Sequence, residues 1–120
     1  MSDHLELSNT SRALCIRPTG RIHAADYELI RPAIEALVAK QGAIRILFQA
    51  DEMEGWTPAA MWEDFKLGVH HHKEVERIAF VVDKKWLEAL AGLTKVFLAA
   101  DVRTFHPEQI DEAKVWIDAE

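Results

Sequence analysis

Two short and almost uninterrupted apolar runs place the strongest constraint on the fold of this chain. They read IRILFQA at residues 44–50 and IAFVV at residues 78–82, and a segment with helical spacing of apolar residues follows each of them. A strand that is apolar at successive positions is covered on both faces, as the central strands of a parallel sheet are. The chain is therefore predicted to be an α/β protein with a mostly parallel sheet.

Three further β-rich runs complete a predicted five-stranded sheet. Residues 5–7 and 13–18 flank the polar segment SNTSR and are expected to pair as an antiparallel hairpin at one edge. Residues 102–105 provide the fifth strand. The predicted order is β-β-α-β-α-β-α-β-α, with right-handed crossovers and a single domain over residues 1–120.

The first and last of the four predicted helices have clear apolar stripes. The first covers about residues 24–40, with Pro32 expected to kink or split it and Gly42 expected to end it. The fourth begins near Pro107. Residues expected to face inward are Tyr27, Ile30, Ile34, Leu37 and Val38 in the first helix and Ile110, Ala113 and Ile117 in the fourth. Glu28, Arg31 and Glu35 share the opposite, polar side of the first helix.

The second predicted helix begins after Thr57 and ends near three consecutive histidines, His70, His71 and His72. Adjacent side chains on a helix point about 100° apart, so the three imidazoles are not expected to converge on one metal ion. On the helical wheel only His72 falls on the apolar stripe. That stripe contains Met61, Trp62, Phe65 and Val69. His72 is therefore a candidate for a partly buried histidine whose protonation loosens a packed contact.

The third predicted helix, in the segment KKWLEALAGLTKVFL, is apolar around most of its circumference. Between residues 86 and 100 only Glu88 and Lys95 are charged, and the two project together. The apolar arc spans about 220°, against about 100° for an ordinary surface helix. A sheet covers only part of such an arc. Leu87 and Leu98 therefore require cover from a neighbouring helix, a second subunit, an apolar ligand or a membrane surface.

Composition excludes several classes of function. The formal net charge of −6 argues against binding to nucleic acid and against docking on anionic lipid by charge alone. No secretion signal and no membrane-spanning run is expected. Cys15 is the single cysteine, lies among apolar neighbours and is expected to be a buried, inert thiol. A reducing cytoplasm suits these features, with peripheral contact with the membrane as an open possibility.

The segment ADEMEGWTP follows the strand at 44–50 and is expected to be a loop at the carboxyl end of the sheet, where open α/β sheets bind ligands. Its three acidic residues, Asp51, Glu52 and Glu54, would repel a phosphate group. Trp56 has no helical stripe to join and is the candidate for a pocket rim or an interface anchor. No glycine-rich phosphate loop and no set of nucleophile and base is found, so no cofactor and no catalytic residue is predicted.

Several quoted segments carry a family resemblance over nearly the whole chain. DYELIRPAIE, the W-x-D-x-K-x-G stretch from Trp62 to Gly68, and ERIAFVVD-x-KWL resemble the SpoIIAA-like family of small bacterial proteins, which is related to STAS domains. The resemblance implies the βα superhelical fold that STAS domains share with CRAL-TRIO lipid-transfer domains. It agrees with the order of elements predicted above.

The resemblance also has implications for function. STAS anti-sigma-factor antagonists are phosphorylated on a serine where the second helix begins, but this chain reads EGWTPAAM there, with Thr57 as the nearest hydroxyl and only a weak candidate phosphoacceptor. The relation to CRAL-TRIO domains implies an apolar ligand pocket under mobile helices.

The leading hypothesis is a non-enzymatic domain that binds a small apolar or lipid-like ligand, with transient membrane association. The residues expected to form the pocket or interface are Trp56, Met61, Trp62, Phe65, His72, Trp86, Leu87, Leu90, Phe97 and Leu98. The alternative is a STAS-type regulator that binds a protein partner and lacks the usual phosphoacceptor serine. A homodimer and a small enzyme stay open, and no metal site and no stable membrane anchor is predicted.

Overall fold

The computed structural model describes residues 5–50, 74–82 and 101–119 together with the backbone of residues 52–56. The strands are β1 (Leu5–Asn9), β2 (Ala13–Ile22), β3 (Ile44–Gln49), β4 (Glu52–Trp56), β5 (Val75–Val81) and β6 (Asp101–Phe105). The helices are α1 (Tyr27–Gln41) and α4 (Ile110–Asp118), preceded by 3₁₀ turns at Ala24–Asp26 and Pro107–Gln109. The second and third predicted helices lie outside the described residues.

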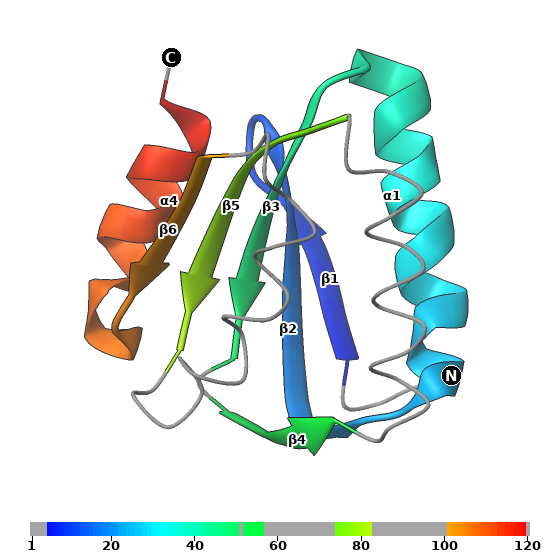
Figure 1. Ribbon diagram of the computed structural model, residues 1–120, viewed down its shortest axis with the longest axis vertical. Helices are drawn as coiled ribbons and strands as arrows, with labels where there is room; N and C mark the ends of the chain where they lie inside the picture. Colours follow the sequence, from blue (N-terminus) through cyan, green and yellow to red (C-terminus); the bar gives the residue numbers. More distant parts are fainter. Residues whose placement is uncertain (1–4, 51, 57–73, 83–100, 120) are drawn as a thin grey trace.

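The sheet has the strand order β1-β2-β3-β5-β6 (Figure 1). Strands β1 and β2 form an antiparallel hairpin at one edge, whereas β2, β3, β5 and β6 pair in parallel. The predicted α/β class, the edge hairpin and the parallel central strands are therefore confirmed. β3 and β5 are buried at most positions, as their apolar sequences predicted.

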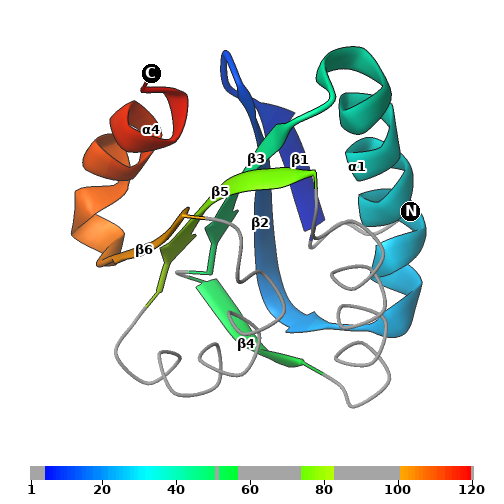
Figure 2. The same ribbon diagram turned by 45° about the horizontal axis from the view of Figure 1, so that its top comes forward.

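The prediction of a loop directly after β3 was wrong. Residues Glu52–Trp56 form β4, which pairs in parallel with the second half of β2, so the sheet in the described part of the chain has six strands rather than five. β3 pairs only with residues 13–16 of β2, which leaves the rest of that edge for β4. Figures 1 and 2 both show β4 beside the end of β2. Pairing with β2 outweighs the low strand propensity of the β4 sequence.

β2 continues beyond its predicted end because a glycine accommodates a shift in the register of its pairing with β4. The register between β2 and β4 shifts between Gly20 and Arg21, and Gly20 has φ of 70°. A residue with a side chain would be strained at this backbone angle. The strand therefore passes through the bulge and carries the chain on to Ile22 at the carboxyl end of the sheet.

Helix α1 packs its apolar stripe on one side of the sheet. Its buried residues are Tyr27, Ile30, Ile34 and Leu37, and Val38 is partly buried against the same core, as predicted. The helix runs through Pro32 without being split. It ends where predicted, because Gly42 has φ of 74° and donates its N–H to Val38 O at 2.8 Å.

Helix α4 packs on the opposite side of the sheet. Ala113 and Ile117 are buried and Ile110 is partly buried against the same cluster, which confirms the predicted inward stripe. The sheet residues in this cluster are Ala13, Cys15, Leu47, Ala79 and Val81. They alternate along each strand with the residues that face α1, so the two helices cover opposite faces.

The carboxyl end of α4 is held by arginines that project from neighbouring strands. Arg45 of β3 is 5% exposed, pairs with Glu76 at 3.0 Å and donates to Ile117 O at 2.8 Å. Arg77, its register partner on β5, donates to Trp116 O at 2.9 Å. Both arginines also donate to Ala119 O. Cations at this end of a helix satisfy its free carbonyls and oppose its negative pole.

Candidate functional site

The carboxyl ends of the parallel strands form the edge where α/β sheets most often bind ligands. In this protein that edge is bordered by β4 and by the turn that leads from β2 into α1 (Figure 1). The last register pair between the two strands joins Ile22 to Trp56, so the backbone of Trp56 lies directly beside the start of that turn.

The turn into α1 is held by a buried carboxylate. Asp26 is 1% exposed, and its Oδ2 accepts a hydrogen bond from the N–H of His23 at 2.8 Å. The N–H of Asp26 donates in return to His23 O at 3.0 Å. These bonds fix the direction in which α1 leaves the sheet.

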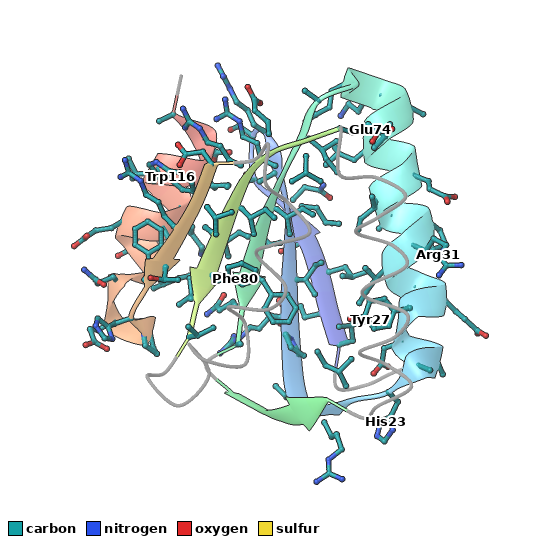
Figure 3. All side chains as sticks on the ribbon, viewed as in Figure 1. His23, Tyr27, Arg31, Glu74, Phe80 and Trp116 are labelled. Atoms are coloured by element: carbon teal, nitrogen blue, oxygen red, sulfur yellow. The ribbon has the colours of Figure 1, made fainter. Side chains whose placement is uncertain are left out.

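A partly open hollow of about 530 Å³ lies along the first turns of α1, bordered by Ala24, Ala25, Tyr27, Glu28, Arg31 and Pro32. Its volume falls within the range of small-molecule sites, roughly 300–1,000 Å³. Figure 3 shows Tyr27 on the sheet side of α1 and Arg31 on the outer side. The hollow thus combines small apolar residues, an aromatic residue, one guanidinium group and one carboxylate.

The described residues show neither a metal-binding cluster nor a membrane-spanning helix. Across residues 5–50, 74–82 and 101–119, no group of three or more His, Cys, Asp or Glu side chains could hold a metal ion. Within the same ranges, no helix has the length and apolar character needed to cross a bilayer.

Cys15 lies on the α4 side of the sheet, away from this edge, and is buried as predicted. Burial raises the pKa of its thiol, while a hydrogen bond with Ser8 and the charge of Lys114 act in the opposite direction. The thiol therefore stays protonated at neutral pH and has little thiolate for nucleophilic chemistry.

Only one residue of the predicted pocket falls within the described part of the chain. Trp56 ends β4 as a backbone position paired with Ile22, rather than standing in a loop. The other predicted pocket residues lie outside the described residues: Met61, Trp62, Phe65, His72, Trp86, Leu87, Leu90, Phe97 and Leu98. Thr57 and the rest of the histidine run lie outside them as well.

The hollow beside α1 was missed at the level of the sequence. Glu28 and Arg31 were assigned to the polar side of the helix, but Arg31 is half-buried and both border the hollow. The available signal was the pair Ala24 and Ala25, small residues directly before a helix at the carboxyl end of a strand. Small side chains leave space there, but only the packing around them decides whether that space forms a pocket.

Comparisons with known proteins agree with the fold described above. The SpoIIAA-like family model matches residues 13–118. The chain is also similar to an uncharacterised protein from the DUF3478 family with a SpoIIAA-like fold, from Shewanella loihica PV-4, known from its crystal structure. The two share 26% sequence identity with a TM-score of 0.73, over 94% of this chain and 91% of the other. No curated protein matches the sequence significantly.

The predicted resemblance is confirmed by these two matches, because the family model covers most of the chain and the structural match covers nearly all of it. The chain belongs to the SpoIIAA-like family.

Proposed function

We propose that this protein is a non-enzymatic binding domain for a small apolar or lipid-like ligand, which it takes up between the second and third predicted helices. In this proposal residues 1–120 act as one domain in the cytoplasm, with transient contact at the membrane surface. No cofactor takes part.

The observation that carries the proposal is the surplus apolar arc of the segment from Trp86 to Leu98. An arc of about 220° exceeds what one face of a sheet covers. An apolar ligand would remove the remaining surface from water, at roughly 25 cal/mol for each Å² buried. Leu87 and Leu98 are the residues that such a ligand would cover.

The hollow beside α1 is a separate feature that suits a small ligand. It lies at the edge of the sheet that binds ligands in open α/β folds, and its volume of about 530 Å³ suits a small molecule.

Displacement of dansyl-undecanoate, together with native mass spectrometry of the purified protein, tests the proposal. The parent protein should bind the probe, and Leu87→Gln with Leu98→Gln should weaken binding at least about tenfold, since two buried aliphatic contacts are lost. The control is Leu29→Gln, because Leu29 on α1 is already 39% exposed. Absence of any bound lipid and of probe binding would overturn the proposal.

A second candidate function is a STAS-type regulator that binds a protein partner. Membership of the SpoIIAA-like family and the strand β4, which fixes the backbone of the acidic segment against β2, favour it. A pull-down with the parent and with Asp51→Lys, Trp56→Ala separates the two functions. A partner that the double variant loses supports regulation, whereas unchanged lipid binding in that variant with no captured partner speaks against it.

His72 provides a further test within the ligand-binding proposal. On the helical wheel it lies on the stripe that would meet the third helix or the ligand. Protonation of His72 should then weaken binding as the pH falls through the range in which histidine titrates, roughly 8 to 5.5. Equal pH profiles for the parent and His72→Gln would remove this role and leave the binding proposal intact.

A further inference from the structure

A second hollow, of about 390 Å³, lies at the other end of α1. It is formed between the β1–β2 turn, residues Asn9–Leu14, and one stripe of the helix consisting of Ala33, Ala36, Leu37, Lys40 and Gln41. On a helix with about 100° between successive residues, this stripe and the stripe that borders the first hollow fall on different flanks of α1. The two hollows are therefore separate.

The floor of this second hollow, called the turn groove below, is apolar. Leu14 and Leu37 belong to the buried core, and the small residues Ala33 and Ala36 leave room between the helix and the hairpin. A ligand that fills the groove would bury a short hydrocarbon or an aromatic ring against these four side chains.

The rim of the turn groove is basic. Arg12 comes from the hairpin and Lys40 from the helix, and none of the described residues that line the groove is acidic. This is unusual for a chain with a net charge of −6. The free carbonyl groups at the end of α1 form its negative pole and disfavour an anion there. The positive charge of Lys40 in the last turn offsets this pole.

The carboxylate of Asp118, which reaches the hairpin from α4, is already engaged. Its Oδ1 accepts hydrogen bonds from Thr10 Oγ1 at 2.6 Å and from the N–H of Arg12 at 3.0 Å. The first bond comes from a side-chain hydroxyl and the second from the backbone of Arg12. The side chain of Arg12 belongs to the lining of the groove.

The width of the groove is fixed by hydrogen bonds between its two walls. The side-chain amide of Gln41 donates to Arg12 O at 3.0 Å and to Ala43 O at 3.2 Å, which ties the hairpin to the end of α1. The turn itself is closed by the N–H of Thr10, which donates to Ala13 O at 2.9 Å. Because these bonds already hold the groove in shape, little conformational entropy is lost when a ligand binds.

We propose that the turn groove binds a small amphiphilic organic anion, a carboxylate with a short alkyl or aromatic body. The apolar floor takes the body, and Arg12 with Lys40 takes the carboxylate. This site is independent of the proposed function, because it involves neither the segment 86–98 nor the hollow at the first turns of α1.

Titration of the ¹⁵N-labelled protein with sodium octanoate, followed by amide chemical shifts, tests the proposal. Shifts should concentrate at residues 9–14 and 33–43, with a dissociation constant on the order of 1 mM, as a small ligand on a shallow site allows. Acetate lacks the body, 1-octanol lacks the charge and octylammonium reverses it, so each should bind several-fold more weakly. Octanoate shifts confined to other residues would overturn this site without touching the proposed function.

Matched variants separate charge from shape. Arg12→Gln with Lys40→Gln should weaken octanoate binding about fivefold, as expected for two exposed ion contacts, whereas Arg21→Gln, exposed at the far end of β2, should not. Ala36→Leu should block the groove, whereas Ala39→Leu, exposed on the same helix and outside the lining, should leave binding unchanged. Equal affinity for octanoate and 1-octanol, or unchanged binding in the Arg12 and Lys40 variant, would refute the proposal.

Discussion

The two faces of the sheet are stabilised in different ways. The face toward α1 buries large apolar side chains, among them Ile16, Phe48, Ile78 and Phe80. The face toward α4 combines small residues such as Ala13 and Ala79 with Leu47 and Val81, and it has arginines at one end. Both faces bury apolar area, and the second adds directed bonds to the carbonyls of one helix end.

This difference predicts which substitutions each face of the sheet should accept. Burial has no direction, so the α1 face should accept exchanges between large apolar residues of similar volume. The hydrogen bonds of Arg45 and Arg77 require a guanidinium group in a fixed position. Trp116 adds a second requirement for arginine, since Arg77 and Arg103 lie 5.3 and 5.1 Å from the centre of its ring. The α4 face should therefore be sensitive to the identity of its residues more than to their size.

The largest effect is expected on the α1 face. Phe80 is buried and meets Phe48 edge to face, with ring centres 6.1 Å apart. Phe80→Ala should lower the free energy of unfolding by about 3–5 kcal/mol, because it removes a buried aromatic ring and leaves a cavity. Phe80→Leu should lower it much less. Urea denaturation measures both, and similar losses for the two variants would break the comparison.

The next effect concerns Arg45. Arg45→Ala should cost about 2–3 kcal/mol, because it leaves the carbonyl of Ile117 without its donor and breaks the pair with Glu76, which is itself half exposed. Arg45→Met fills the same space without the bonds. If directed bonds hold this face, Arg45→Met should remain clearly less stable than the parent; if it equals the parent, the face is held by packing after all.

A smaller effect is expected where α4 meets the hairpin. Asp118→Ala should cost about 1–2 kcal/mol, because the hydroxyl of Thr10 and the N–H of Arg12 lose their charged acceptor. Asp118→Asn keeps one acceptor oxygen and should lose about half as much. Thermal unfolding of both variants checks this, and a larger loss in the asparagine variant would contradict it.

The smallest effect is a pH dependence on the α4 face. Burial raises the pKa of Cys15, so the folded protein holds this proton more tightly than the unfolded chain does. The contribution of this thiol to the free energy of unfolding is fully present below about pH 8.5, where the thiol of the unfolded chain titrates. It declines as the pH rises through the higher pKa of the folded protein. The difference in free energy of unfolding between the parent and Cys15→Ala, measured from pH 7 to 10, should fall with pH. A flat difference would show that the thiol is solvated.

The parts of the fold that were predictable are those whose signal is local. β3 and β5 carry continuous apolar runs, Gly42 ends α1, and Ile110, Ala113 and Ile117 repeat at helical spacing. β4 was not predictable, because Glu52, Glu54 and Gly55 have low strand propensity and the strand exists only through its pairing with β2. In the sequence, Arg45 is a polar residue within an otherwise apolar strand. Its role becomes clear only from its partners on α4, far along the chain.

The two hollows depend on packing in the same manner. Small residues along α1, at Ala24 and Ala25 and again at Ala33 and Ala36, mark where space is left, but the sequence does not say which element stands opposite. The pocket residues predicted from apolar stripes lie outside the described residues apart from Trp56, so that prediction awaits the binding experiments.

The bond between Thr10 and Asp118 also bears on how the protein forms during translation. Its two ends are 108 residues apart in the chain, so the β1–β2 turn leaves the ribosome long before its partner is made. Until then the α4 face, with its row of arginines, has no helix to dock against. The α1 side can assemble first, since its last strand, β5, is made before α4, and closure of the other face is expected to follow as a later step.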